Sequence, residues 1–117
     1  TIELRTIHIN NAKDKAISIG EFSNLNGENI YIINSSYGIV NKDLSIASFS
    51  NVNIDSSKIA ISVFQKKSEF GPAKLYLNNI FINTYSKDYL VEDGSVLYID
   101  GKLQPTNIRN AKSMIYD

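Results

Sequence analysis

The chain has little of what several classes of functional site require. Its 117 residues include no cysteine and one histidine, His8. The absence of cysteine excludes disulfides, thiolate metal sites and cysteine nucleophiles, and one histidine alone cannot form a histidine-based metal cluster. We therefore expect no cofactor and no metal, and we identify no catalytic residue.

A surplus of charge and a long hydrophobic run are also missing. Twelve basic residues balance twelve acidic ones, so the formal net charge is zero and nothing favours nucleic acid or an anionic membrane as a partner. No apolar run approaches the roughly 18 residues of a membrane-spanning helix, so we expect no membrane insertion. The hydrophobic share of 43% excludes intrinsic disorder as the main state, and the length corresponds to one domain.

An internal repeat is the strongest pattern that is present. A first series of alternating apolar residues runs through 6–9, 29–32, 51–54 and 79–82. A second series contains Ile17, Ile39 and Ile61, which follow one another at a spacing of 22 residues. A third, weaker series runs through 24–26, 45–47, 74–77 and 96–99. Alternation of this kind, rich in Ile and Val, predicts short half-buried strands, and no segment carries a sustained helical period.

The three series predict an all-β fold in which each repeat stacks on the next, with Asn, Asp, Ser and Gly in the turns. Stacking buries a continuous apolar column. We expect a parallel solenoid of about four to five coils over residues 1–100, with three short strands per coil. The repeats lie near 4–23, 24–45, 46–72 and 73–95, and 101–117 is expected to be an irregular C-terminal cap or a lead-out. We also expect further repeats before Thr1, because this stack is short for such a fold.

Two of the turns carry polar residues at nearly the same place in successive repeats. The first holds Asn10 or Asn11, Asn34, Asp55 and Asn83, and the second holds Glu21, Lys42 and Glu92. Stacked amides at the first predict a ladder of hydrogen bonds, and alternating charges at the second predict weak ion pairs. Asn26 and Gly27 together are typical of a tight turn.

Rows of short Ile-rich strands with Asn-containing corners, at a period near 22, resemble the right-handed parallel β-helix of the pectate-lyase-like superfamily. The resemblance covers residues 7–100, and that superfamily includes polysaccharide lyases and hydrolases, phage tailspikes, adhesins and spacers. Segments 14–23, 38–45 and 65–72 are also similar to solenoid segments of bacterial surface proteins that carry spore-coat-H-like domains. Both resemblances imply an extracellular or bacterial cell-surface location.

A leucine-rich repeat is the alternative fold, because Leu4, Ile7 and Ile9 fit the start of its L-x-x-L-x-L pattern. The asparagine position of that pattern is occupied by Ala, Ser or Tyr in this chain. The remainder of each repeat has the alternation of a strand rather than the period of a helix. These mismatches favour the solenoid.

An insertion in the third repeat is the first candidate binding site. Val63 and Leu75 are 12 positions apart, whereas Ile19 and Leu25 are 6 apart, so residues 65–72 are expected to bulge from the coil. Function in repeat proteins tends to lie in such insertions. The candidate contact residues are Gln65, Lys66, Lys67, Glu69 and Phe70. The alternative is a loop whose phenylalanine packs on the edge of the coil.

A row of outward aromatic residues in the first series is the second candidate. His8, Tyr31 and Phe81 are predicted to share one column with Asn53. Such a strip can stack on sugars. Alternatively, outward aromatic residues on neighbouring strands stabilise the sheet itself, by roughly 0.2 to 1 kcal/mol per pair.

Catalytic sites of the resembling superfamily have no clear counterpart here. Its lyases hold Ca²⁺ with clustered carboxylates and use Arg or Lys as the base, but Arg5 lies in the first repeat and Arg109 in the tail. We therefore expect a non-catalytic module of a larger bacterial secreted or surface protein, which binds a polysaccharide or another protein through residues 65–72. The alternative is a fragment of a polysaccharide lyase or glycoside hydrolase whose catalytic coils lie outside this chain. A third reading is self-association through the coil edges.

Overall fold

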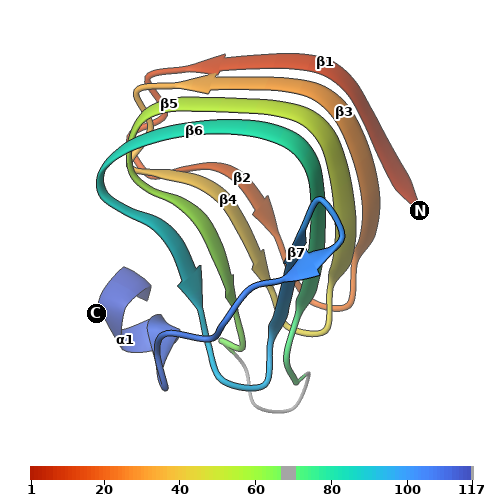
Figure 1. Cartoon of the computed structure of the whole chain (residues 1–117), viewed down its shortest axis with the longest axis vertical. Helices are drawn as coiled ribbons and strands as arrows, with labels where there is room; N and C mark the ends of the chain where they lie inside the picture. Colours follow the sequence, from red (N-terminus) through yellow and green to blue (C-terminus); the bar gives the residue numbers. More distant parts are fainter. Residues whose placement is uncertain (67–70, 117) are drawn as a thin grey trace.

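The computed structural model describes residues 1–66 and 71–116, and most of this part of the chain is β-strand (Figure 1). In chain order the elements are β1 (Ile2–Asn10), β2 (Lys15–Ile19), β3 (Asn24–Ile33), β4 (Tyr37–Lys42), β5 (Ile46–Phe64), β6 (Lys74–Val91), β7 (Val96–Ile99), β8 (Lys102–Leu103) and the helix α1 (Ala111–Tyr116). The strands form one eight-stranded sheet whose pairing is parallel apart from β7 with β8. The expected all-β, mostly parallel architecture is confirmed.

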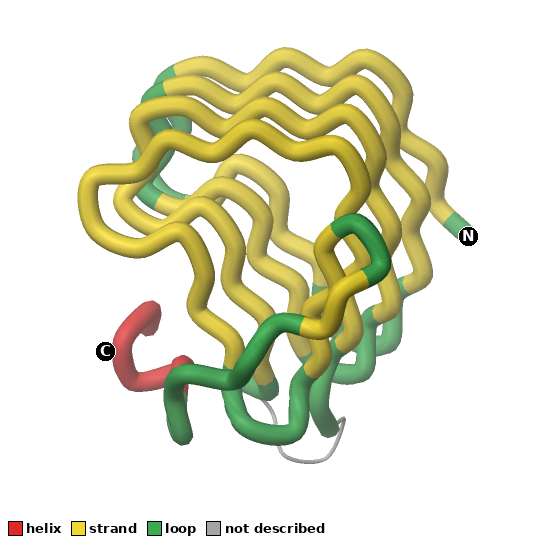
Figure 2. The backbone as a smooth tube through the Cα atoms, viewed as in Figure 1, coloured by secondary structure: helices red, strands yellow, loops and turns green. Residues whose placement is uncertain are grey.

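The sheet keeps a regular register from one repeat to the next, as the nested path of the backbone in Figure 2 shows. The main path is β1-β3-β5-β6-β7-β8, and β4 pairs with both β2 and β5. Ile7 lies beside Ile30, Ile30 beside Val52, and Val52 beside Ile80. Outward side chains therefore form rows that cross the strands, and inward side chains form apolar columns.

The apolar columns make up the core of the fold. The large side chains that are almost completely buried are Phe49, Phe64, Ile30, Ile32, Ile39, Ile54, Ile61, Leu75, Leu77, Leu90, Leu97 and Val40. Burial of each such side chain stabilises the folded state by roughly 1.5–3 kcal/mol. A strand in this sheet is thus held mainly by its neighbours in the stack, which explains why short segments of weak individual propensity form strands at all.

Three separate short strands per repeat are not observed, so that part of the prediction is wrong. The third and first series of alternating residues join into one strand in β1 and β3, and β5 and β6 also include the second series. The joins lie at Thr6, Asn29, Asn51 and Asn79, whose φ angles are 53°, 58°, 56° and 55°. One left-handed residue turns the chain while its neighbours stay paired with the next repeat, and asparagine tolerates this conformation better than most residues.

The asparagines at these bends also bond to one another, which the sequence analysis did not predict. Asn51 Nδ2 donates to Asn29 Oδ1 at 3.2 Å, and Asn79 Nδ2 donates to Asn51 Oδ1 at 2.5 Å. The amide ladder runs along the bend and ties three successive strands together.

The ladder predicted for the following corner is present only in part. Asn83 Nδ2 donates to Asp55 Oδ1 at 2.9 Å. The residue beside Asp55 on the other side is Ile33, not Asn34, and Ile33 in turn lies beside Asn10. The row therefore contains one amide–carboxylate bond rather than a continuous ladder.

The side-by-side alignment predicted for the charges at the second turn is wrong by one residue, although the charge of Glu21 does act on Lys42: burial lowers the pKa of Lys42, and Glu21 raises it. Ile19 lies beside Asn41, which places Lys42 beside Gly20 instead of Glu21. A Cβ atom on Gly20 would lie 3.1 Å from the Lys42 Cε. The glycine therefore leaves room for the lysine, whose Nζ donates to Ser18 Oγ at 3.0 Å.

Gly27 lies inside β3, so the predicted turn at Asn26 and Gly27 does not exist. In the inward column, Gly27 lies between Leu4 and Phe49. A Cβ atom on Gly27 would lie 2.6 Å from the Phe49 ring. The glycine is therefore needed because its missing side chain makes space for a large buried neighbour.

The C-terminal segment packs against the last full repeat. The Asn107 side chain accepts a hydrogen bond from Val91 N at 2.8 Å and donates to Tyr89 O at 2.8 Å. The Glu92 carboxylate accepts from Gln65 N at 3.0 Å and from Ala111 N at 2.9 Å. Neither β8 nor α1, which lie in this segment, was predicted from the sequence. Figure 1 shows α1 close to the end of β6.

Candidate functional site

The predicted aromatic residues do lie in one outward row. The register places His8 beside Tyr31, Tyr31 beside Asn53, and Asn53 beside Phe81, and we call these four residues the aromatic row. Tyr31 is 38% and Phe81 57% exposed. Between Tyr31 and Phe81, the strand β5 is paired with β3 on one side and with β6 on the other, so at Asn53 a ligand is recognised by side chains.

The aromatic row divides into two parts. The His8 and Tyr31 rings stack with centroids 4.7 Å apart and planes within 13°, so this pair stabilises the sheet, as in the structural alternative. Tyr31 and Phe81 are separated by Asn53 and lie two strands apart, which corresponds to about 10 Å. Asn53 is half-buried between them, and its amide offers both a donor and an acceptor.

A second aromatic pair was missed in the sequence analysis. Tyr76 of β6 and Tyr98 of β7 stack with centroids 5.3 Å apart and planes within 5°. The signal was available, because both tyrosines occupy the same position of the third series. Their row continues through Ser48 to Asn26 on the preceding strands.

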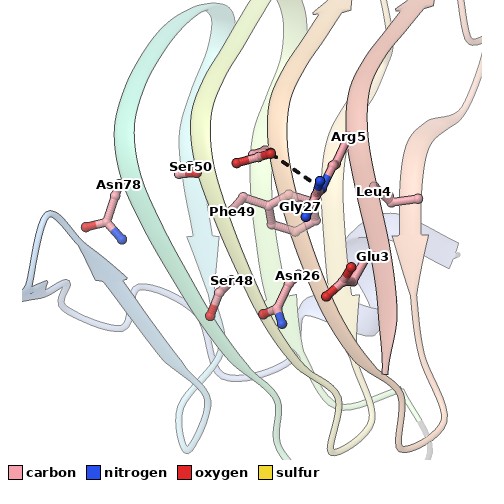
Figure 3. Close-up of a pocket in the computed structure, with 10 residues that line it drawn as sticks. Glu3, Leu4, Arg5, Asn26, Gly27, Ser48, Phe49, Ser50 and Asn78 are labelled. Atoms are coloured by element: carbon pink, nitrogen blue, oxygen red, sulfur yellow. Dashed lines mark ion pairs between the residues drawn. The ribbon is translucent and has the colours of Figure 1, made fainter.

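Figure 3 shows a groove of about 340 Å³ whose lining includes Asn26 and Ser48, and Ser48 lies beside Tyr76 in the register. Its lining residues are Glu3, Leu4, Arg5, Asn26, Gly27, Glu28, Ser48, Phe49, Ser50 and Asn78. Across its edge, Arg5 Nε lies 3.6 Å from Glu28 Oε1, and both side chains are largely exposed. The sequence analysis did not identify this groove.

The inserted loop lies where it was predicted. β5 ends at Phe64 and β6 begins at Lys74, and the register between them is offset by 28 residues, compared with 22 between β3 and β5. Gln65 N and Lys66 N donate to the carboxylates of Glu92 and Asp43, at 3.0 and 2.7 Å.

Three of the five predicted contact residues, Lys67, Glu69 and Phe70, lie outside the described residues. Binding through residues 65–72 therefore stays a prediction.

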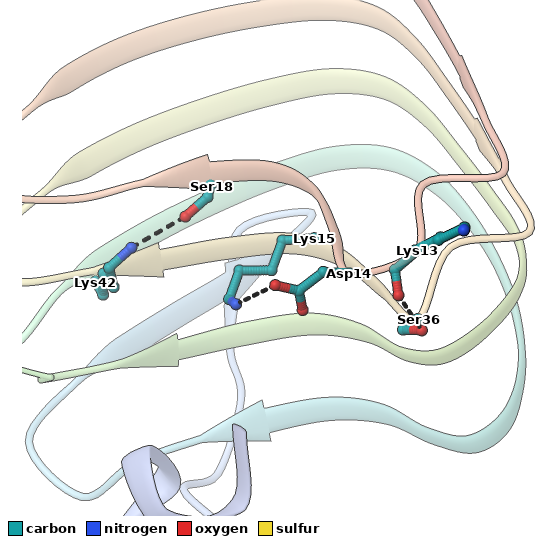
Figure 4. A network of polar contacts seen from close by, with 6 residues as sticks. All are labelled: Lys13, Asp14, Lys15, Ser18, Ser36 and Lys42. Atoms are coloured by element: carbon teal, nitrogen blue, oxygen red, sulfur yellow. Dashed lines mark hydrogen bonds and ion pairs between the residues drawn. The ribbon is translucent and has the colours of Figure 1, made fainter. Parts of the chain in front are cut away.

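Polar contacts on the outer side of β2 and β4 hold neighbouring repeats together (Figure 4). Ser36 Oγ donates to Lys13 O at 2.9 Å and Lys42 Nζ to Ser18 Oγ at 3.0 Å, whereas the pair of Lys15 Nζ and Asp14 Oδ2, 2.9 Å apart, lies within one repeat. Partial burial lowers the pKa of Lys42, and the nearby charge of Lys66 lowers it further. The polar contacts between repeats join neighbouring strands. They do not converge on a common point.

Acidic side chains in the part of the chain that the structure describes do not gather into a cation site. Within residues 1–66 and 71–116, no three His, Cys, Asp or Glu side chains are placed to hold a metal ion together. Asp43 and Glu92 are buried and accept hydrogen bonds from backbone N–H groups. Their observed contacts are therefore structural.

Comparison of the chain with protein-family models, curated proteins and solved structures finds no match. Among the helices described, which amount to α1, none is long and apolar enough to cross a membrane.

Proposed function

We propose that the chain is part of a right-handed parallel β-helix, a solenoid similar to those of the pectate-lyase-like superfamily, within a larger bacterial secreted or surface protein. The parallel register, the apolar columns and the asparagine bends support this proposal. In such a solenoid, residues 101–117 act as a terminal cap. The hydrogen bonds that Asn107 and Ala111 N form with Val91 N and Glu92 of the last repeat support that role.

We further propose that the module is non-catalytic and recognises a glycan. The observation that carries this proposal is the position of Asn53 between two exposed aromatic side chains, Tyr31 and Phe81. A sugar ring placed over Asn53 packs its C–H groups against the aromatic side chains and bonds its hydroxyls to the amide. Apolar surface with a few placed polar groups is the usual composition of a small-molecule site.

Substitutions within the aromatic row test the proposal in a glycan-binding screen followed by calorimetry. We expect Tyr31→Ala and Phe81→Ala to weaken binding, and His8→Ala, outside the Asn53 position, to leave it nearly unchanged. The sharpest variant is Asn53→Tyr, which completes the aromatic row. It should block the ligand while stabilising the fold by about 0.2–1 kcal/mol, because each new cross-strand aromatic pair contributes that much.

Other results would overturn the proposal. Binding that survives Asn53→Tyr but is lost in Lys66→Ala/Lys67→Ala/Phe70→Ala would move the site to residues 65–72. Capture of a protein partner without glycan binding would overturn the ligand class. Release of unsaturated uronates or reducing ends from polysaccharides would instead support a lyase or hydrolase.

A further inference from the structure

The groove of Figure 3 is distinct from the aromatic row. It lies before the asparagine bend along each strand, whereas the aromatic row lies after it. Two rows of outward side chains flank the groove. One row contains Glu3, Asn26 and Ser48, and the other contains Arg5, Glu28, Ser50 and Asn78. Because both rows cross the strands, the groove runs along the direction in which the repeats stack.

Four neutral polar side chains are the main hydrogen-bonding groups of the groove. Asn26, Ser48, Ser50 and Asn78 all combine donor and acceptor atoms. Among the residues that the structure describes, none of these four side chains takes part in a hydrogen bond with another protein group. They are therefore available for a ligand that carries many hydroxyl groups.

The charges of the groove disfavour an anionic ligand. Its charged lining residues are Glu3, Arg5 and Glu28, and the Arg5 guanidinium already lies 3.6 Å from the Glu28 carboxylate. A uronate, sulfate or phosphate group would find a surplus of negative charge and a cation that is already paired. A neutral ligand does not meet this electrostatic cost.

The backbone of the groove disfavours an extended peptide. The strands beneath it, β1, β3, β5 and β6, are paired with one another in register. Addition of a peptide strand requires a free sheet edge. Among the described strands, β1 has such an edge at one end of the groove, but β3 and β5, which carry Asn26, Ser48 and Ser50, are paired on both sides. Over β3 and β5, recognition must therefore use the side chains of the two rows.

The stacked tyrosines extend the groove at one end. Tyr76 and Tyr98 continue the row of Asn26 and Ser48 on the next two strands. A chain ligand that follows this row passes from the amide and hydroxyl groups onto aromatic side chains. Adjacent strands are about 4.8 Å apart, so three to four strands offer a path of about 10–14 Å.

We propose that this groove binds an uncharged oligosaccharide chain that lies across the strands, with its hydroxyls bonded to Asn26, Ser48, Ser50 and Asn78 and one end packed on Tyr76. This inference rests on the proposed glycan-binding function but assigns a second, separate site. It also predicts a preference for neutral over acidic chains, which the aromatic row alone does not.

Calorimetric titration with neutral cello-, xylo- and manno-oligosaccharides, and with oligogalacturonate as the acidic counterpart, tests the proposal. We expect Asn26→Ala/Asn78→Ala to weaken neutral-chain binding at least about tenfold, since two hydrogen bonds are lost. Asn24→Ala is the matched control, because Asn24 is an exposed residue of the same strand outside the groove. Circular dichroism of each variant verifies folding.

The outcomes separate the two sites. Neutral-chain binding that is lost in Asn26→Ala/Asn78→Ala but kept in Asn53→Tyr supports the groove. Binding that is lost only in Asn53→Tyr overturns the groove and leaves the proposed function standing. Tighter binding of oligogalacturonate than of every neutral chain overturns the inferred ligand class, and absence of binding to all of these sugars overturns the groove proposal.

Discussion

The two ends of the stack differ in how their outermost strands are covered. At the open end, β1 and β2 each pair with one neighbour among the described strands, β3 and β4 respectively. At the covered end, β7 pairs with the first part of β6, and Asn107, Ile108 and α1 pack against its last residues. Between these two covered parts, β6 has no further partner strand among the described residues, and Ile80 and Ile82 are half-buried there.

Burial follows this difference in covering. Leu90, Val91 and Leu97 at the covered end are fully buried, whereas Ile2 at the open end is 51% exposed and Leu4 is half-buried. Ile2 and Leu97 occupy the two ends of one column, which runs through Leu25, Ala47 and Leu75. The comparison teaches that the repeat pattern alone does not decide burial: Ile2 and Leu4 of β1 stay accessible, whereas Ile17 and Ile19 of β2, which also has one partner strand, are buried in the core.

Truncation of one leucine at each end of the stack should give the largest difference in the free energy of unfolding between the two ends. We expect Leu97→Ala to lower the free energy of unfolding by about 2–5 kcal/mol, since it leaves a cavity in a packed column. Leu4→Ala should cost about 1 kcal/mol or less, because solvent already reaches this residue. Urea denaturation of both variants measures the difference, and equal losses would contradict the comparison.

Removal of the buried carboxylate at the covered end should have the next largest effect. Glu92→Ala leaves Gln65 N and Ala111 N without their acceptor, so we expect a loss of about 2–3 kcal/mol. Glu28→Ala is the counterpart near the open end. It breaks only an exposed ion pair with Arg5 and should cost about 0–1 kcal/mol. A loss in Glu92→Ala no greater than in Glu28→Ala would show that Glu92 does not anchor the tail.

The variant Asn107→Ala measures how much one side chain contributes to the stability of the covered end. Asn107→Ala removes two hydrogen bonds to the edge of β6, and we expect a loss of about 1–2 kcal/mol. Hydrogen exchange at Val91 N should accelerate in this variant. Asn10→Ala, on the exposed edge strand β1, is the control and should change stability by less than about 0.5 kcal/mol.

A smaller, pH-dependent effect is expected at Tyr89. Burial raises the pKa of the Tyr89 hydroxyl above its usual value of 10, and the charge of Asp88 raises it further. Between pH 10 and the raised pKa, the folded state binds more protons than the unfolded state, so stability falls as the pH rises. Tyr89→Phe should reduce this fall, whereas Tyr85→Phe, at an exposed position, should reduce it less. An unchanged pH dependence in Tyr89→Phe would contradict the expectation.

Alternation and spacing predicted those parts of the fold that depend on one strand and its neighbour. The columns of Ile30 and Ile39, the row of His8 and Tyr31, and the insertion after Phe64 all follow from a period of two within strands and a near-constant period between them. These features were predicted correctly because each depends on which face a residue occupies.

Features that depend on backbone conformation or on distant packing were not predicted. Asn29 was assigned to the start of a strand, although its positive φ makes it the bend within a longer one. Gly27 was assigned to a turn, because the sequence does not show that the Phe49 ring fills its space. The groove was missed for the same reason, since it arises from side chains on three or more strands.

The arrangement of hydrogen bonds has a mechanical consequence. Bonds between strands point along the direction in which the repeats stack, and most contacts of each repeat are with its neighbours. A force applied along that direction therefore loads one strand pair at a time, and the chain should peel repeat by repeat, starting with β1 and β2. A force applied along the strands loads many bonds together in shear. The molecule should therefore be stiff under a force along the strands and should extend in steps under a force along the stacking direction.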